Sequence, residues 1–203
     1  MPLPRLGRLE PKLYIAQTLG MPSFTQLVPE GDNRLRDVCD SCGYIAYSNP
    51  KVVVGSVLVE GARVLLCRRA IEPRRGFWTL PAGFLEHGET LEEGAAREAA
   101  EEAGARIAFD GILAVYSISR IGQVQVMFRA RFAGAPQFAP GDESLEVHLF
   151  GWDEIPWSEL AFPSVHWALQ AWREVGDGPL SAPATNPPTD RRGVNRILTE
   201  VAL

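Results

Sequence analysis

Apolar and polar positions along the chain first predict a β-rich middle section. Blocks of β-branched and aromatic residues are separated by Gly, Pro, Asn and Asp, which is the pattern of strands joined by turns. The first two blocks flank a short turn at Gly61 and Ala62, so they predict a β-hairpin. The predicted strands are 51–60, 63–70, a short one within 77–86, 106–119, 123–132 and 145–150.

Two further segments carry the signals of helices. Residues 90–103 begin with Thr90 and Glu93, which have the spacing of a capping box. They are followed by Gly104, which suits a left-handed C-terminal cap. Residues 163–175 have the period of an amphipathic helix. Strands and helices in this order predict an α/β or α+β fold, in which helices cover a sheet.

The two ends of the chain differ from this middle section. The first 33 or so residues show no clear period and finish in the turn-forming sequence PEGDN. From residue 176 the chain is rich in Pro, Ala and Thr, which is typical of a flexible segment. The predicted organisation is an irregular arm at 1–36, a cysteine-containing segment at 37–50, a main domain at 51–175 and a flexible tail at 176–203.

Composition narrows the classes of protein that fit. The 203 residues, 46% hydrophobic and 22% charged, suit one globular domain with additions at its ends. The net charge of −5 argues against a general binder of nucleic acid or of anionic membranes, so neither is an expected partner. No apolar run is long enough for a transmembrane helix. Three cysteines form no disulfide framework, which predicts a reducing compartment, the cytoplasm.

The helix predicted at 90–103 is unusual because its acidic residues share one side. Glu98 and Glu102 lie above one another at about 100° per residue, and Glu101 lies on the adjoining edge. Gly94 and Ala95 fall on the same side one turn earlier. A different side carries small residues suited to packing on a sheet, Ala96, Ala99, Ala100 and Ala103.

This acidic side carries two energetic costs, which favour a functional explanation. Like charges four residues apart destabilise a helix by about 0.3 kcal/mol, and an interior glycine such as Gly94 costs about 1 kcal/mol. A cleft that admits a cation and a bulky phosphate accounts for both, with Gly94 as the gap that lets substrate approach. Carboxylates are the ligands that Mg²⁺ and Mn²⁺ prefer. The alternative interpretation is an acidic face exposed to solvent.

The same stretch resembles a known motif. Gly83 is followed after five residues by Glu89, and after seven more by the run R-E-A-x-E-E-x-G-A that begins at Arg97. This matches the Nudix box at every fixed position. Ala99 and Ala105 stand at two positions where the family usually has bulky aliphatic residues.

The wider stretch 37–172 is similar to Nudix hydrolases of the ADP-ribose/FAD pyrophosphatase type. The resemblance implies a Nudix fold, a mixed β-sheet sandwiched between helices (α/β/α) with a small ribbon-like N-terminal extension. It implies divalent metal held by the backbone carbonyl of Ala82 and by Glu98, Glu101 and Glu102. It also implies structural roles in the motif for Gly83, Glu89, Arg97 and Gly104, with Arg97 and Glu89 paired.

A general base is expected near the metal. In similar enzymes a glutamate outside the box can remove the proton of the attacking water, which makes Glu143 and Glu146 candidates. Glu143 lies in a turn-like sequence and Glu146 begins a strand. Glu98 is the alternative base.

Substrate contacts are expected from basic and aromatic residues before the box. Arg68, Arg69, Arg74 and Arg75 could bind phosphate oxygens as bidentate donors. Adjacent strand residues point to opposite faces, so at most two of the four would do so. Trp78 could stack on a base or flavin ring, although burial in the core is the alternative.

The region after the box bears on which substrate is bound. It lacks the S-Q-P-W-P-F-P-x-S array of similar enzymes specific for NADH, so NADH is disfavoured. Ser119 stands near where ADP-ribose enzymes often have a proline, which leaves room for FAD or another adenosine diphosphate conjugate.

Cys39 and Cys42 resemble half of a zinc ribbon. Structural zinc takes four protein ligands, and the preceding residues 16–28 contain no Cys or His. Cys67 falls in a predicted strand and is interpreted as a small core residue. We therefore expect a degenerate ribbon at 37–50 that keeps the shape without a complete zinc site, or that borrows ligands from a partner chain.

The leading hypothesis is a Mg²⁺- or Mn²⁺-dependent Nudix pyrophosphohydrolase. Its partner would be a small nucleoside diphosphate conjugate such as ADP-ribose or FAD, from which it would release AMP, and it would be a homodimer. The alternatives are a Nudix protein that binds nucleotides as a regulator and an enzyme that removes damaged nucleoside triphosphates.

Overall fold

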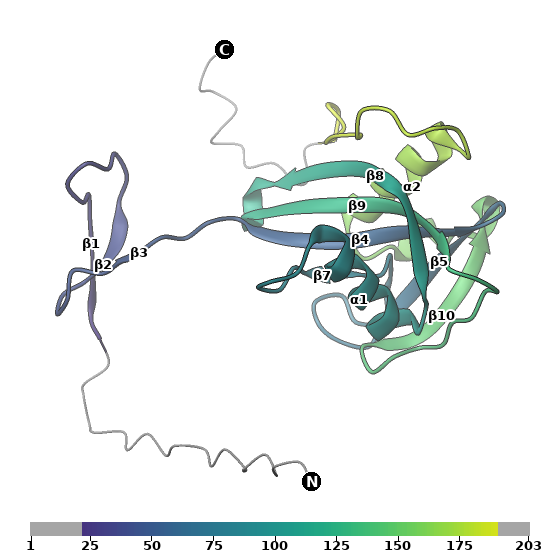
Figure 1. Cartoon of the computed structure of the whole chain (residues 1–203), viewed down its shortest axis with the longest axis horizontal. Helices are drawn as coiled ribbons and strands as arrows, with labels where there is room; N and C mark the ends of the chain where they lie inside the picture. The colour runs from purple at the N-terminus through teal and green to yellow at the C-terminus, as the bar shows by residue number, and fades with distance from the viewer. Residues whose placement is uncertain (1–21, 191–203) are drawn as a thin grey trace, which may run out of the picture. The chain divides into compact units, whose positions relative to one another are not determined.

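A computed structural model of the protein describes residues 22–190. The chain divides into two compact units, Met1–Ser48 and Asn49–Leu203 (Figure 1). The part of the predicted arm before residue 22 and the part of the predicted tail after residue 190 lie outside the described residues.

The N-terminal unit contains a three-stranded antiparallel sheet. Its strands are β1 (Phe24–Leu27), β2 (Arg36–Cys39) and β3 (Ile45–Ala46), in the order β1-β2-β3. Strand β1 lies inside the segment predicted as an irregular arm, so that prediction is wrong for these residues. All four β1 residues are exposed, and a strand without a buried face leaves no alternating pattern in the sequence.

The larger unit is built on a seven-stranded mixed sheet. Its main path runs β10-β5-β4-β9-β8, with β6 paired to β5 and β7 paired to β4. Strands β4 and β9 are parallel, and the other pairs are antiparallel. The predicted hairpin is confirmed, because β4 and β5 pair next to their connecting turn. The strands are β4 (Lys51–Glu60), β5 (Arg63–Arg69), β6 (Trp78–Thr79), β7 (Ala82–Phe84), β8 (Ile107–Ile118), β9 (Gln123–Phe132) and β10 (Ser144–Gly151).

Two α-helices cover opposite faces of this sheet (Figure 1). Helix α1 (Leu91–Ala103) contributes Ala95 and Ala103 to the apolar cores on one face, and α2 (Pro163–Val175) contributes to the large core on the other. The α/β/α sandwich is thereby confirmed. Three short 3₁₀ segments connect the elements: η1 (Ser119–Ile121), η2 (Trp152–Glu154) and η3 (Trp157–Glu159).

The packing side of α1 differs from the predicted one. Ala95, Ala99 and Ala103 are fully buried, whereas Ala100 is exposed. A Cβ added at Gly94 would lie 2.8 Å from Leu85 Cδ1 and 2.9 Å from Val54 Cγ2. Gly94 therefore lets the helix approach β4 closely, and the prediction that it opens a path for substrate is wrong. The helix wheel gave the spacing of side chains but not which side meets the sheet.

The segment after α2 also differs from the predicted flexible tail. Within it, Ala184 pairs with β8: the Ala184 amide donates to the Leu113 carbonyl at 2.9 Å, and the Val115 amide donates to the Ala184 carbonyl at 2.8 Å. The Asn186 side chain bonds both backbone groups of Ser117. Ala184 and Asn186 thus hydrogen-bond backbone groups of β8. This is a tertiary contact, and a composition rich in Pro and Ala does not reveal it.

Candidate active site

Helix α1 begins and ends where the sequence predicts. The Thr90 hydroxyl accepts the Glu93 amide at 3.1 Å, and the Glu93 carboxylate accepts the Thr90 amide at 2.8 Å. Gly104 ends the helix with φ 58°, in the left-handed region that glycine adopts without strain. The predicted capping box and C-terminal cap are both confirmed, so the acidic residues between them have a fixed angular position.

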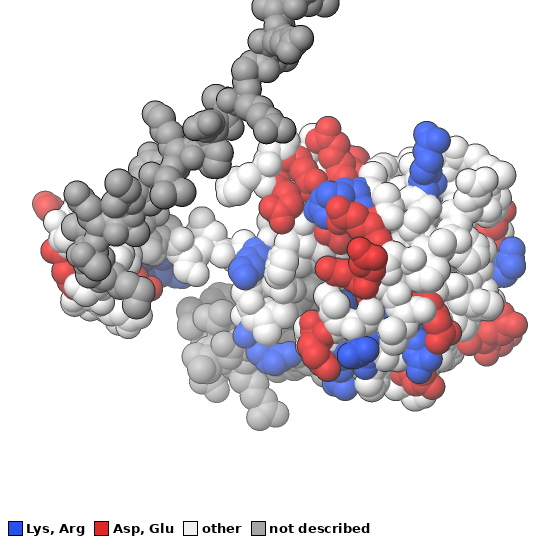
Figure 2. All heavy atoms as spheres, turned by 90° about the horizontal axis from the view of Figure 1, so that it is seen from below, with Lys and Arg blue, Asp and Glu red and all other residues white. Residues whose placement is uncertain are grey.

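A cavity of about 980 Å³ lies beside this helix, at the upper end of the range for small-molecule sites. Its lining includes seven carboxylates from segments far apart in the sequence. Glu98, Glu101 and Glu102 come from α1, Asp142 and Glu143 from the loop before β10, and Glu72 and Glu86 from loops that precede α1. Acidic side chains gather around a basic group on one face of the larger unit (Figure 2). The predicted metal ligands therefore share one cavity.

Glycine at position 83 allows one of these carboxylates to reach the sheet. A Cβ at Gly83 would collide with the carboxylate of Glu98. The neighbouring amide of Ala82 donates a hydrogen bond to Glu102 Oε2 at 3.0 Å. Glu98 and Glu102 are only 8% and 5% exposed. The acidic side of α1 is therefore packed against β7, and the prediction that acidic and packing residues occupy separate faces is wrong.

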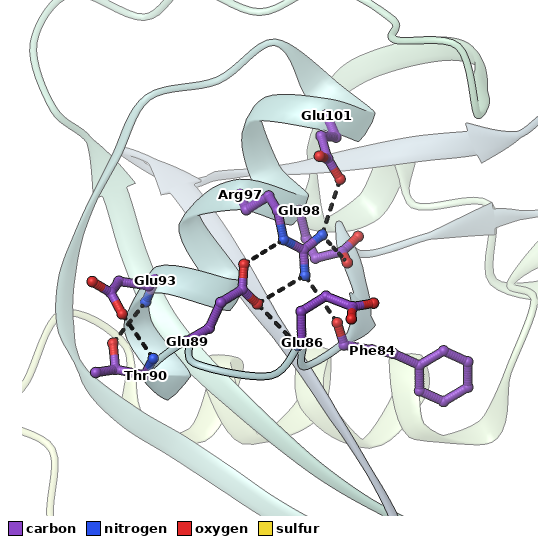
Figure 3. A network of polar contacts seen from close by, with 8 residues as sticks. All are labelled: Phe84, Glu86, Glu89, Thr90, Glu93, Arg97, Glu98 and Glu101. Carbon is purple, nitrogen blue, oxygen red and sulfur yellow. Dashed lines mark hydrogen bonds and ion pairs between the residues drawn. The ribbon is translucent and has the colours of Figure 1, made fainter. Parts of the chain in front are cut away.

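Arg97 joins the loop before α1 to the helix (Figure 3). Its guanidinium donates to both carboxylate oxygens of Glu89, at 2.7 and 3.1 Å, and to the carbonyl of Phe84 at 2.9 Å. It also pairs with Glu98 at 2.7 Å and Glu101 at 3.0 Å. The Arg97 hydrogen bonds lower the pKa of Glu89. The predicted pairing of Glu89 with Arg97 is present.

Two acids of α1, Glu98 and Glu102, are buried, and their pKa values are raised. Burial raises the pKa of Glu102 to about 7, with smaller contributions from Glu98 and Glu143, while the Ala82 amide and Arg69 oppose the rise. Burial also raises the pKa of Glu98, against the opposing pull of Arg97. A bound cation would favour the ionised form of both groups. All-oxygen donors of this kind fit a hard divalent cation.

The donors are not already arranged around a common point. Among residues 22–190, no three His, Cys, Asp or Glu side chains form a metal-binding cluster. Arg97 holds Glu98 and Glu101 in ion pairs. A cation bound to these carboxylates would therefore have to draw them away from the guanidinium.

The raised pKa of Glu102 predicts how the stability of the metal-free protein depends on pH. Between pH 4.5 and 7 the folded chain binds more protons at Glu102 than the unfolded chain does, so the free energy of unfolding must fall as the pH rises. A rise from 4.5 to about 7 corresponds to a loss of about 3 kcal/mol by pH 8. Urea unfolding in EDTA across this range measures it.

The matched variant is Glu102→Gln, which should show a clearly flatter profile over the same range because the titrating group is gone. Carboxylates with lowered pKa, such as Glu89 and Asp110, act below this window. The lowered pKa of Cys39 acts above about pH 7 with the opposite sign, but it is common to both proteins and cancels in the comparison with Glu102→Gln. A wild-type profile with no fall between pH 5 and 8 would contradict the assignment.

Of the predicted substrate-binding arginines, the structure brings one to the cavity. Arg69 lines it, donates to the Pro73 carbonyl at 2.8 Å and lies 5.3 Å from the ring centre of Phe162. Arg68 instead pairs with Glu146 at 2.8 Å, and the exposed Arg74 packs over a neighbouring ring outside the cavity lining. The alternation of strand side chains explains why Arg68 and Arg69 part.

Trp78 and Glu146 are also placed away from the acidic cavity. Trp78 is 7% exposed and makes an edge contact with Phe150. It is therefore a core residue, which was the alternative interpretation of this tryptophan. Glu146 and Trp78 line a separate, smaller hollow. Of the two glutamates considered as a base, only Glu143 lies with the acids of α1.

Several cavity residues were not singled out from the sequence: Arg120, Gln123, Gln125 and Phe162. Gln123 and Gln125 alternate with Val124 and Val126 along β9. Polar residues at every second position of a strand with neighbours on both sides are a signal that could have identified them.

The cysteines lie in two different settings. In the N-terminal unit Cys39 is buried, with its Sγ 3.1 Å from Ser41 Oγ, while Cys42 is exposed. Hydrogen bonds with Ser41 and with neighbouring backbone amides lower the pKa of Cys39 to about 7. Cys67 is buried in the core, as predicted. The absence of a complete zinc site in the ribbon-like segment stays a prediction.

Comparison with known families agrees with this site. The family model described as NUDIX domain matches residues 49–172, and the zinc-ribbon model described as Nudix N-terminal matches residues 20–48. The chain belongs to the Nudix hydrolase family. Within that family its similarity to ADP-ribose pyrophosphatases supports a pyrophosphohydrolase.

The chain is similar to three proteins of this family, among others. A Nudix hydrolase from Nitrosomonas europaea is 45% identical, with a TM-score of 0.76, and the alignment covers 84% of this chain and 97% of that one. An ADP-ribose pyrophosphatase from Methanocaldococcus jannaschii is 32% identical over 59% of this chain and 71% of its own length. A MutT-like protein from Streptomyces ambofaciens is 39% identical over 51% of this chain and 64% of its own length.

No helix within residues 22–190 is long and apolar enough to cross a membrane.

Proposed function

We propose that the protein hydrolyses the pyrophosphate bond of a nucleoside diphosphate linked to another moiety, such as ADP-ribose or FAD, and releases AMP with the help of Mg²⁺ or Mn²⁺. The observation that carries this proposal is the shared cavity. The cavity is lined by the carboxylates of α1 and by Arg69, and the rest of its wall is largely apolar. The similarity to the ADP-ribose pyrophosphatase supports the substrate class.

The acids of α1 would hold the cation. Glu98, Glu101 and Glu102, with the Ala82 carbonyl, supply oxygen donors, and the cation contributes charge neutralisation and a lowered pKa for the attacking water. Gly83 and Arg97 position these donors, Gly83 by leaving space and Arg97 by bracing the loop. Because the site is partly desolvated, these interactions are stronger than in open water.

Arg69 and Glu143 complete the proposed chemistry. Arg69 would bind a phosphate oxygen, since its charge opposes the rise in the pKa of Glu102 and its side chain is held by the Pro73 carbonyl and the Phe162 ring. Glu143 would accept the proton of the attacking water, because it lines the cavity from a loop outside the helix. Glu98 is the alternative acceptor.

A substrate panel tests the proposal. The protein is incubated with Mg²⁺ and ADP-ribose, FAD, NADH, ADP-glucose or nucleoside triphosphates, and the products are separated. Release of AMP from a diphosphate conjugate is the expected result. Cleavage of triphosphates to a monophosphate and pyrophosphate would instead favour an enzyme that removes damaged nucleoside triphosphates. The similarity to the MutT-like protein is the reason to test this alternative. Tight binding without turnover of any compound would favour a regulatory binding protein.

A further inference from the structure

The cavity floor is formed by one face of the sheet. The register aligns Phe84 of β7, Val53 of β4 and Gln125 of β9 in one row across three strands. The next row contains Ala82 and Met127, with Gly55 between them. All but Gly55 of these residues line the cavity. The floor therefore runs continuously from the proposed metal ligand Ala82 toward β9.

Two glutamines lie at the β9 end of this floor. The Gln125 side-chain amide donates to Gln123 Oε1 at 3.1 Å. This bond uses the NH₂ group of Gln125 and the oxygen of Gln123. The NH₂ group of Gln123 and the oxygen of Gln125 are not used in it. The half-buried pair, two residues apart on one face of β9, can therefore offer both a donor and an acceptor to a ligand in the cavity.

The surroundings of this pair suit a flat, largely apolar group. Ile118 is the cross-strand partner of Gln123, and it lines the cavity together with Met127, Ile121 and Val165. Ile121 is 51% exposed at the tip of the β8–β9 connection. An exposed branched side chain at a cavity wall can cover the face of a ring without hydrogen-bonding it.

The distance from the acids fits a nucleotide. Two strand spacings separate β7 from β9, which is about 10 Å. A diphosphate held at the β7 end would extend one sugar toward β9. The ring attached to that sugar would then meet the glutamine pair.

We propose that Gln123 and Gln125 hydrogen-bond the edge of a planar heterocycle in the substrate, a ring that carries a donor and an acceptor side by side. For adenine, the Gln125 oxygen would accept from N6 and the Gln123 NH₂ group would donate to N7, the two atoms that a single glutamine amide also recognises. The flavin ring offers the same chemistry through an N–H and a neighbouring carbonyl. The inference rests on the proposed function for the place of the diphosphate, but it concerns binding and does not depend on turnover.

Direct binding tests it. Gln123→Met and Gln125→Met remove the amide at nearly constant volume, and titration calorimetry measures AMP, FMN and ribose 5-phosphate with each variant. Gln170→Met on the exposed side of α2 is the control. We expect the affinity for the recognised ring compound to fall about tenfold, as for one or two lost hydrogen bonds, with no change for ribose 5-phosphate.

The three ligands distinguish the possible results. A loss confined to AMP assigns the pair to adenine, and a loss confined to FMN assigns it to the flavin. Unchanged affinity for both compounds in both folded variants overturns the inference, even if the substrate panel shows full turnover. A ring-specific loss without turnover of any conjugate would support the inference while the proposed function fails. Thermal unfolding checks each variant, and because the two are made singly, a folding defect in one leaves the other as the test.

Discussion

Glu102→Gln is expected to lower turnover by about 100- to 1,000-fold while the fold stays intact. Glu102 is buried, accepts the Ala82 amide and faces the other acids of the cavity. Glutamine keeps the size and one oxygen but carries no negative charge, so it binds a divalent cation weakly. Initial rates on the best substrate of the panel, across a Mg²⁺ titration, measure the effect.

The control for this variant lies on the same helix. Glu92 is exposed in the first turn and does not line the cavity, so Glu92→Gln removes the same charge without touching the site. It should retain wild-type turnover. If Glu102→Gln were nearly as active as Glu92→Gln, the assignment of Glu102 as a metal ligand would be refuted. Circular dichroism shows whether both variants keep the fold.

Arg97→Gln is expected to lower the free energy of unfolding by about 2–3 kcal/mol. The side chain is only 26% exposed and its guanidinium serves Glu89, Glu98 and a loop carbonyl together. Removing it leaves half-buried carboxylates without their partner, which costs more than losing a surface ion pair. Urea unfolding without divalent cations measures the change. Turnover should also fall, because the loop before α1 loses the brace that Arg97 provides through the Phe84 carbonyl and Glu89.

Two further variants distinguish this bracing role from a simple charge effect. Arg131→Gln removes an arginine whose side chain is 64% exposed and paired with Asp110, so it should cost less than about 1 kcal/mol. Arg97→Lys keeps the charge but not the planar fork of donors, so it should recover only part of the stability. Equal stability of Arg97→Lys and wild type would show that charge alone suffices.

The degree to which the sequence predicted the site differs from residue to residue. The ends of α1 depend on contacts within one turn, so their spacing is visible in the chain. The pairing of Arg97 with Glu89, eight residues apart, was expected only from the resemblance to the Nudix box. Gly94 was misjudged because its role depends on Val54 and Leu85, which the helix wheel does not contain. Arg68 and Arg69 could be separated by alternation, but only the register shows which one faces the cavity.

The sequence by itself determined the helices and strands of the main domain, the caps and the acidic motif, because hydrophobic period, turn residues and motif spacing are local properties of the chain. Tertiary structure decided which carboxylates are desolvated, that Glu143 joins them while Glu146 pairs with Arg68, and that two glutamines of β9 face the same cavity. Those facts arise from strand register and from the side of α1 that meets the sheet. Both are set by packing between segments far apart in the sequence.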